Sequence, residues 1–352
     1  MSFNSNLTNW FDKNKRELPW RKSNDPYKIW LSEIILQQTQ VKQGLPYYNK
    51  FLKNYPNIYE LARSSENEVM KNWQGLGYYS RARNLHFTAK YIVHELNGIF
   101  PKKYIDLIKL KGVGDYTASA IASICFDESV AVLDGNVFRV LSRYFGIEIP
   151  INSTQGIKHF KSLAKSLLPK KRIGDYNQAV MEFGALQCKP KSPNCSICPI
   201  NVNCVAFTTN NTKNLPIKIK RSKIKDRYFN FLVYLTKKSE TVIEKRNVKG
   251  IWQQLYQFPL IETESSVSKK NLMSYKKGLE KYNLINPEIE LINKIELINK
   301  SEIVHKLSHQ RLHIKFWKLN KKIKHHKTVY WNDLKKYPVP SPIAEFIRSY
   351  KP

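Results

Sequence analysis

This 352-residue chain has no long apolar run and few acidic residues for its length. No stretch approaches the roughly 20 consecutive apolar residues of a membrane-spanning helix, so we expect no membrane span. The opening segment, MSFNSNLTNWFDKNKRELPW, lacks the apolar core of a signal peptide, and we therefore expect a cytoplasmic protein. In that reducing compartment the five cysteines are not expected to form structural disulfides.

The shortage of acids leaves a large positive charge. Against 28 Asp and Glu residues stand 59 Lys and Arg residues, so the net charge is +31. Such a field favours polyanions: DNA, RNA or an anionic membrane surface. Lysine, however, outnumbers arginine 46 to 13, and a lysine-rich composition shared across a genome would produce the same charge. Charge alone therefore leaves the partner open.

Length and local pattern indicate two domains. At about 150 residues per domain the chain is long enough for two. Residues 1–209 are predicted to be helical, because apolar residues recur three and four apart and no alternating strand is evident. Residues 210–227 are polar and basic without periodicity, which is typical of a linker. Residues 228–352 mix alternating and helical segments and are predicted to form an α+β domain.

The same patterns predict individual elements. Helices are predicted at 61–73, 85–98, 157–168, 271–283 and 343–350. Strands are predicted at 228–235, 241–246 and 309–319. The repeated IELINK at 289–300 is too short to indicate a repeat architecture.

Four of the five cysteines form a cluster. Cys188, Cys195, Cys198 and Cys204 follow the spacing C-x6-C-x2-C-x5-C. Four thiolates on one short loop can ligate a tetrahedral zinc ion or a cubane [4Fe–4S] cluster. Zinc ribbons usually offer two C-x2-C pairs far apart, and this sequence has one such pair. The remaining Cys125 lies in the apolar segment ASAIASICF and is interpreted as a core residue.

A second motif is a tight turn between two helical segments at 107–124. Gly112 and Gly114 flank Val113 and allow the backbone to turn sharply. The unpaired N–H groups that open the second helix suit a phosphate group. A Gly-x-Gly turn alone is a weak signal, but together with the charge and the cysteine loop it indicates a contact with a nucleic acid backbone.

Two carboxylates stand out by their surroundings. Asp134 ends an apolar stretch and immediately precedes an amphipathic helix, so its simplest role is a helix N-cap. Glu33 lies in the predominantly apolar segment WLSEIIL, where burial would raise its pKa as a proton donor requires. A partly exposed helix glutamate is the alternative for Glu33.

Several motifs occur together in one order. They are LPWR (18–21), WLSEIILQQTQV (30–41), GLGYYSRARNL (75–85), LDGNV (133–137) and the cysteine loop. In this order they resemble the MutY family of adenine DNA glycosylases, which are helix–hairpin–helix enzymes of the endonuclease III class. The resemblance is dense over the first half and thin thereafter. It implies a mainly helical glycosylase domain, a [4Fe–4S] cluster on the loop 188–204 and a Nudix-like α+β C-terminal domain.

The resemblance also implies roles for single residues. Glu33 would protonate adenine N7 and Asp134 would stabilise the oxocarbenium-like sugar, with Tyr116 and Asn136 hydrogen-bonding in the same site. The adenine pocket would comprise Arg16, Trp20, Arg21 and Glu182. The DNA-binding residues would be Gln37, Gln38, Tyr78, Lys111, Gly112, Val113 and Gly114. Gln37 and Tyr78 match residues that wedge into the duplex, and ordinary packing is the alternative for both.

Three positions depart from relatives within the superfamily. Glycosylases that also cleave the strand carry a lysine in the hairpin that forms a Schiff base, and here Tyr116 occupies that position. A phenol cannot form an imine, so we expect no efficient lyase activity. Phe138 stands where some relatives have a lysine, and Lys111 replaces the usual proline before Gly112.

The C-terminal half resembles the lesion-reading domain of the same family. It lacks the clustered R-E-x-x-E-E helix that Nudix hydrolases use to bind metal, so it is interpreted as a binding module. Ser308 and His309 match a turn that family members use to recognise 8-oxoguanine, although Leu307 replaces the usual aromatic residue. His313, His325 and His326 have no acids or cysteines nearby in the sequence and are expected at the surface.

The predicted function is a monofunctional adenine DNA glycosylase of base excision repair. Its expected partner is double-stranded DNA with adenine opposite 8-oxoguanine or guanine. It is expected to be a monomer in the bacterial cytosol or nucleoid. Two alternatives remain open: a related glycosylase for oxidised pyrimidines or for T or U opposite G, and a non-enzymatic DNA-binding iron–sulfur protein. The second alternative would not need Glu33 together with Asp134.

Overall fold

The structure is a computed structural model that describes residues 2–219, 224–275, 278, 280–282, 295–299, 301–319 and 328–352. The chain forms two compact units, residues 1–64 with 83–221 and residues 65–82 with 222–352. The second unit thus includes a segment of the helical half that the predicted boundary at 209 does not assign to it. Among the described helices, none has the length and apolar character needed to cross a bilayer.

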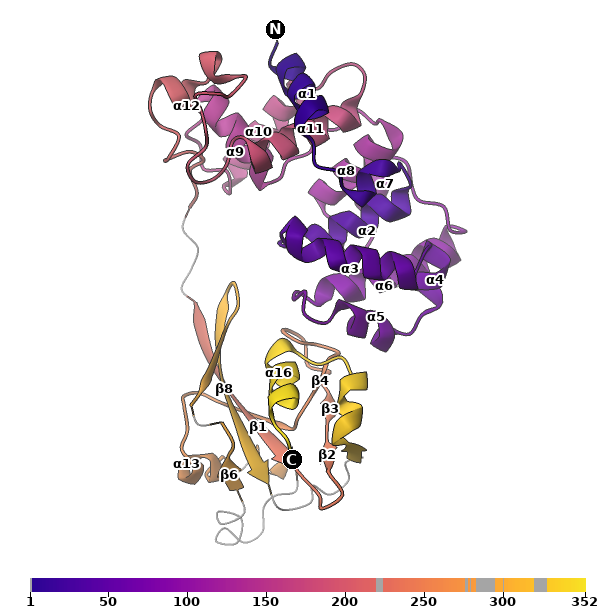
Figure 1. Cartoon of the computed structure of the whole chain (residues 1–352), viewed down its shortest axis with the longest axis vertical. Coiled ribbons are helices and arrows are strands. Elements are labelled where there is room, and N and C mark those ends of the chain that lie inside the picture. The colour runs from indigo at the N-terminus through magenta and orange to yellow at the C-terminus, as the bar shows by residue number, and fades with distance from the viewer. Residues whose placement is uncertain are drawn as a thin grey trace. The chain divides into compact units, whose positions relative to one another are not determined.

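The described part of the chain before Lys225 is helical (Figure 1), as the sequence predicts. Its α-helices are α1 Phe3–Asn14, α2 Pro26–Leu36, α3 Val41–Asn54, α4 Ile58–Arg63, α5 Glu66–Trp73, α6 Ser80–Glu95, α7 Tyr104–Leu107, α8 Asp115–Phe126, α9 Gly135–Phe145, α10 Thr154–Ser166, α11 Ile173–Leu186 and α12 Val205–Thr208. Short 3-10 helices occur at Pro19–Lys22 and Asn201–Asn203. The predicted helices at 85–98 and 157–168 correspond to α6 and α10.

The prediction of one helix at 61–73 is wrong, because the chain breaks between α4 and α5. Ser65 caps α5: its hydroxyl accepts from the Glu68 N–H at 3.2 Å, and the Glu68 carboxylate accepts from the Ser65 N–H at 2.8 Å. This reciprocal capping box supplies side-chain acceptors to the Ser65 and Glu68 N–H groups, as is typical of a helix start. A new helix therefore begins here.

Helix α11 organises the core of the helical unit. It packs against α1, α8 and α9, while α2 packs against α8 and α3. Leu7, Val140, Phe160 and Phe183 are buried in one apolar cluster that joins α1, α9, α10 and α11. As a result, the side chains of α2, α8 and α9 that carry the predicted chemistry belong to one packed unit.

The C-terminal half contains the strands. They are β1 Lys225–Tyr234, β2 Glu240–Val242, β3 Glu244–Lys245, β4 Tyr256–Gln257, β5 Leu260–Thr263, β6 Ile295–Leu297, β7 Ile303–Lys306, β8 Gln310–Leu319 and β9 Thr328–Tyr330. The main sheet has the order β5-β1-β8-β6, with β7 also paired to β8. Strands β1 and β8 are parallel and the other pairs are antiparallel. A 3-10 helix Trp331–Lys336 and helices α13 Lys269–Met273 and α16 Ser341–Ser349 complete the described elements.

Both faces of the main sheet are buried. On one face, Phe316 of β8 stacks on Phe346 of α16 with ring centroids 3.8 Å apart. On the other, Leu232 and Trp317 lie in an apolar cluster with Leu272 of α13. Burial on both faces explains why the second half of β1 is a continuous buried run (Phe229–Tyr234) rather than a strict alternation.

Several predicted limits need correction. Strand β1 begins at Lys225, inside the predicted linker, because Lys225 pairs with Gln310 across the sheet. The predicted strand 241–246 is two strands in different sheets, since β2 pairs with β9 and β3 with β4. The first IELINK copy, His325, His326 and residues 276, 277, 279 and 283 of the predicted helix 271–283 lie outside the described residues.

Candidate active site and cluster loop

Glu33 is a buried acid on α2. The residue is 7% exposed, so the alternative of a partly exposed glutamate is wrong. The pKa of Glu33 is raised to about 7, chiefly by burial and also by the nearby Asp134, against the lowering effects of a hydrogen bond from Tyr116 and the charge of Arg21. A carboxyl group with this pKa is partly protonated at neutral pH and can therefore donate a proton.

Asp134 is the N-cap of α9, as the sequence predicts. Its carboxylate accepts from the backbone N–H groups of Asn136 at 2.9 Å and Val137 at 2.7 Å, and from Asn136 Nδ2 at 2.6 Å. Burial raises the pKa of Asp134 and outweighs these hydrogen bonds, which lower it. Because its donors hold both oxygens, the carboxylate has a fixed orientation.

Tyr116 of α8 lies between the two acids. Burial raises its pKa well above the usual value, and the charges of Glu33 and Asp134 raise it further. Its hydroxyl also lies 3.6 Å from Met181 Sδ. The structure therefore brings Glu33 of α2 together with Tyr116, Asp134 and Asn136 of the consecutive helices α8 and α9.

A second cluster joins the N-terminal segment to α11. Glu182 is 2% exposed and accepts hydrogen bonds from both Arg16 (2.8 and 2.6 Å) and Arg21 (2.9 and 2.8 Å). Burial alone would raise the pKa of Glu182, but these hydrogen bonds lower it to about 2. Trp20 is buried edge-to-face against Tyr48. The four residues predicted for the adenine pocket thus lie in buried or half-buried positions, three of them in one ion-pair network.

Arg139 connects this site to the cysteine loop. Its guanidinium donates to Asn136 Oδ1 at 2.8 Å and to the carbonyl oxygens of Cys188 at 2.8 Å and Gly184 at 2.6 Å. Asn136 in turn donates to Asp134. A single buried arginine therefore ties the start of the loop to the capping carboxylate.

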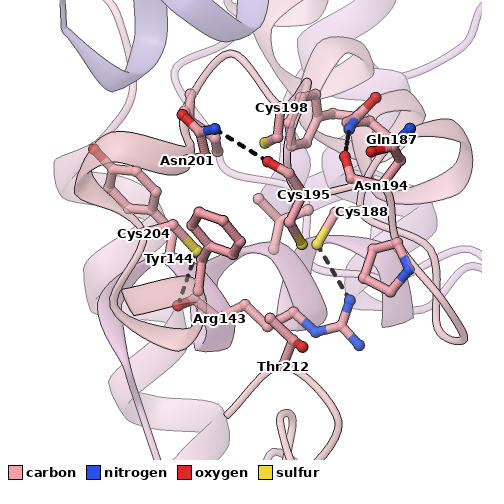
Figure 2. A pocket seen from close by; sticks show the side chains of 15 residues that line it. Arg143, Tyr144, Gln187, Cys188, Asn194, Cys195, Cys198, Asn201, Cys204 and Thr212 are labelled. Carbon is pink, nitrogen blue, oxygen red and sulfur yellow. Dashed lines mark hydrogen bonds between the residues drawn. The ribbon is translucent and has the colours of Figure 1, made fainter. Parts of the chain in front are cut away.

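The four predicted ligands line one cavity. Figure 2 shows the sulfur atoms of Cys188, Cys195, Cys198 and Cys204 around a common space, with Arg143 beside them. Arg143 Nη1 lies 3.4 Å from Cys188 Sγ, and its guanidinium also donates to the carbonyl oxygens of Lys189 and Pro190. Within the described ranges, no group of three or more His, Cys, Asp or Glu side chains is placed to hold a single metal ion. Cys125 is half-buried on α8.

The predicted hairpin is a short helix, a turn and a long helix. Gly112 has φ +82° and a Cβ there would lie 2.6 Å from Asn84 Cβ, so the turn requires glycine. Val113 is buried, and Gly114 precedes α8 as its N-cap. The Lys111 ammonium lies 4.2 Å from the centre of the Phe87 ring. The backbone N–H groups of the first turn of α8 therefore come directly after the glycine turn in the sequence.

The two predicted wedge segments have unusual backbones. Gln37 Nε2 donates to Thr117 Oγ1 at 3.2 Å, and Gln38 beside it is exposed with φ +54°. Tyr78 is 42% exposed with φ +46°, and the Arg81 guanidinium lies 5.7 Å from its ring centre. Left-handed backbones at non-glycine residues are uncommon and often mark functional turns.

Ser308 and His309 lie on the exposed turn between β7 and β8, where Ser308 Oγ is 3.1 Å from His309 Nδ1. The prediction that His313 has no acids nearby is wrong. Its ring lies between Glu302 (2.5 Å) and Asp226 (3.0 Å) and stacks on Tyr228. Burial lowers the pKa of His313, but the two carboxylates raise it overall.

Sequence reasoning missed the buried arginines Arg139 and Arg143. Both are less than a tenth exposed, and with Asn136 they follow the spacing i, i+3, i+7 along one side of α9. That spacing was the available signal, because two arginines on the buried side of an amphipathic helix need buried partners.

Comparisons with known proteins agree with this arrangement. Residues 31–166 match the HhH-GPD superfamily of base excision DNA repair proteins, and residues 230–349 match the NUDIX domain. The adenine DNA glycosylase of Buchnera aphidicola subsp. Baizongia pistaciae is 36% identical over 357 residues, covering 99% of this chain and 97% of the relative. That of Mus musculus is 45% identical over 215 residues, covering 58% of this chain and 42% of the relative.

Solved structures show the same fold for the helical half. A thermostable thymine-DNA glycosylase is 29% identical with a TM-score of 0.55, over 59% of this chain and 95% of that chain. A non-covalent endonuclease III–DNA complex, at 21% identity and a TM-score of 0.51 over 59% and 94%, shares the fold. The predicted fold class and family are confirmed. With full-length relatives at this identity, the chain belongs to the MutY family of adenine DNA glycosylases, base excision repair enzymes that hydrolyse N-glycosidic bonds.

Proposed function

We propose that this adenine DNA glycosylase excises adenine paired with 8-oxoguanine or guanine and does so without efficient strand cleavage. The observation that carries the proposal is the buried Glu33, with its raised pKa, beside Tyr116 and the capped Asp134. An acid that holds its proton at neutral pH and a second, fixed carboxyl group are what leaving-group protonation and cation stabilisation require.

The reaction follows from these roles. Adenine first leaves the base stack, which costs a few kcal/mol. Glu33 then donates its proton to adenine N7 while the bond between N9 and the sugar C1′ breaks, and the bonding electrons stay with the base. The Asp134 carboxylate stabilises the positive charge at C1′. Water adds at C1′ and returns its proton to Glu33, so the enzyme ends in its starting state.

The ion-pair network beside this site supports adenine recognition. Arg16 and Arg21 are both fixed by the Glu182 carboxylate, so their positions do not depend on the substrate. A preorganised pocket spends less binding free energy on ordering side chains when the base arrives. With Trp20 adjacent to Arg21 in the chain, these residues form the proposed wall of the adenine pocket.

The rate of bond cleavage should depend on pH through both acids. Glu33 acts in its protonated form, so the rate should fall about tenfold per pH unit above pH about 7. Asp134 acts in its ionised form, and since its pKa is raised, the acid limb should lie above the usual aspartate range. Single-turnover rates measured from pH 4 to pH 9 test this. A rate that kept rising above pH 8 would contradict a proton donor at this site.

The absence of a lysine at the Schiff-base position supports a monofunctional reaction. Tyr116 occupies the position of the Schiff-base lysine, and its hydroxyl faces Glu33 within a buried site. A phenol has no amine to attack C1′, so the strand stays intact after the base leaves.

We also propose that the turn of Ser308 and His309 reads 8-oxoguanine. Both side chains are exposed and belong to the turn that precedes β8. The hydroxyl and ring nitrogen can pair with the N7 hydrogen and C8 oxygen that distinguish 8-oxoguanine from guanine. The C-terminal domain thus acts in recognition.

Changing Ser308 and His309 together to alanine should lower the preference for adenine opposite 8-oxoguanine over adenine opposite guanine. Each hydrogen bond contributes about 0.5–1.5 kcal/mol net, so the loss of two should lower the preference roughly ten- to hundredfold. The measurement is the ratio of single-turnover rates on the two duplexes at subsaturating enzyme. An unchanged ratio would show that this turn reads something else.

The cysteine loop fits a [4Fe–4S] cluster. Four thiols surround a shared cavity, and the buried Arg139 and Arg143 supply positive charge beside them, which suits an anionic thiolate-bound cluster. Cys188, Cys195, Cys198 and Cys204 would be its ligands. When bound, the cluster would order the loop and, through the Cys188 carbonyl, support Arg139.

Purified protein should therefore contain about four irons per chain and absorb near 400 nm. Cys198→Ser should lower iron content and thermal stability together, because one ligand and its contribution to folding are lost. Cys125→Ser on α8 is the matched control and should retain full iron. Colourless protein with one bound zinc would contradict the assignment.

The hairpin of Lys111 to Gly114 is the proposed anchor for the DNA backbone, and Gln37, Gln38 and Tyr78 are proposed to contact the opened duplex. Gly114 leaves the first turn of α8 uncovered, since a Cβ there would meet no atom within 4 Å.

We propose that the enzyme acts on DNA as a monomer in the cytoplasm.

A further inference from the structure

An aspartate lies where the hairpin is proposed to hold a phosphate. Asp115 is the first residue of α8 and follows Gly114 directly. Its side chain is 40% exposed, so its charge faces the same solvent as the N–H groups of the turn. A carboxylate at this position repels a phosphate group, and it therefore requires compensation in a DNA-binding protein.

Two groups compensate this carboxylate. Lys161 Nζ of α10 lies 2.7 Å from Asp115 Oδ1, and Tyr104 Oη of α7 donates to the same oxygen at 2.7 Å. Lys161 is 46 residues away in sequence and reaches the hairpin from another helix. An exposed ion pair of this kind contributes at most about 1 kcal/mol to stability, so folding alone gives a weak reason for it.

Lys161 belongs to a basic face of α10. Lys158, Lys161 and Lys165 are all exposed and follow the spacing i, i+3, i+7, which places them on one side of the helix. The opposite side buries Phe160 and Ala164 in the core. No acidic residue occurs within α10 (TQGIKHFKSLAKS), so these charges are not cancelled by their own helix.

We propose that Lys158, Lys161 and Lys165 form a second DNA backbone contact that continues from the hairpin, and that Lys161 also cancels the charge of Asp115 at the phosphate site. This inference rests on the proposed role of the hairpin. The partner is the sugar–phosphate backbone of duplex DNA, because ammonium groups at the surface of a helix bind phosphates as point charges without reading bases.

The proposed backbone contact of Lys158, Lys161 and Lys165 can be tested by the salt dependence of binding. The probe is a duplex of about 30 base pairs without a mispair. Each backbone contact adds about 0.9 to the slope of log K against log salt. Changing all three lysines to glutamine should lower the slope by about 3 and weaken binding at ~0.1 M salt roughly fivefold to tenfold per lysine. Lys161→Gln should have the largest single effect, because it also leaves Asp115 uncompensated.

Control variants separate the possible causes. Lys161→Arg should bind as the unchanged protein does, and Lys53→Gln at the exposed last turn of α3 should leave the slope unchanged. Asp115→Asn added to Lys161→Gln should recover affinity. Lys111→Gln reports on the hairpin independently. If Lys111→Gln lowers the slope and the triple variant does not, the proposed contact of α10 is wrong and the role of the hairpin is retained. If neither variant lowers the slope, the proposed role of the hairpin is wrong as well.

Discussion

Changing Glu33 to glutamine is expected to slow adenine release by about 10²–10⁴-fold, the usual contribution of a general acid. Glutamine has nearly the same shape, so the buried site on α2 should keep its packing while losing its transferable proton. The measurement is the single-turnover rate on a duplex with adenine opposite 8-oxoguanine at saturating enzyme. Binding to that duplex should stay within a few-fold of the unchanged protein.

Glu60→Gln on α4 is the matched control, because Glu60 is a half-exposed carboxylate paired only to Arg63 among the ion pairs found in the described residues. It should release adenine at the normal rate. If Glu33→Gln retained activity within about tenfold, Glu33 would not be the proton donor, and the raised pKa of Glu33 would need a different explanation.

Changing Asp134 to asparagine should be similarly severe for the rate and mild for stability. Asparagine is as good a helix N-cap as aspartate, so the bonds to the N–H groups of Asn136 and Val137 can be retained. The negative charge next to C1′ is lost, and we expect the rate to fall on the order of a hundredfold or more.

Asp134→Ala separates the two roles of this side chain. It removes both charge and cap, so it should be as slow as Asp134→Asn and less stable by about 1 kcal/mol in urea unfolding. Equal rates for Asp134→Asn and the unchanged protein would show that the residue serves the fold alone.

The helices of the N-terminal half were largely predictable, because the spacing of apolar residues within each segment is enough to identify a helix. The apolar spacing of α6 and α10 was sufficient to identify both helices. The break between α4 and α5 was also written in the sequence, since Ser65 and Glu68 have the capping-box spacing, but apolar residues on both sides masked it. The start of β1 was not predictable locally: Lys225 is polar and exposed, and it is a strand residue because Gln310 pairs with it.

In the candidate site, too, features set by neighbouring residues were predictable and contacts between distant residues were not. Asp134 could be recognised as a cap from its immediate neighbours. The apolar residues around Glu33 left a partly exposed glutamate open, and the structure was needed to show that Glu33 is buried. The partners of His313 could not be, because Asp226 is 87 residues away and reaches it through sheet pairing. Contacts made by the fold, rather than by neighbours in sequence, were the ones that needed the structure.

Helix α9 shows how one element can serve both centres. Its first turn is capped by Asp134, its middle carries Arg139 and its last turn carries Arg143 beside Cys188. Helix α9 therefore joins the capping carboxylate to the two arginines that hold the cysteine loop, and we expect damage to the loop to alter the position of Asp134.

The most direct test of the central claim is a product analysis on matched duplexes that carry adenine opposite 8-oxoguanine, adenine opposite guanine, thymine glycol, or thymine opposite guanine. We predict that free adenine is released from the first two and no base from the others. The strand should break only after alkali, and borohydride should trap no covalent complex. Base release from thymine glycol or from thymine opposite guanine, or strand breaks without alkali, would contradict the account.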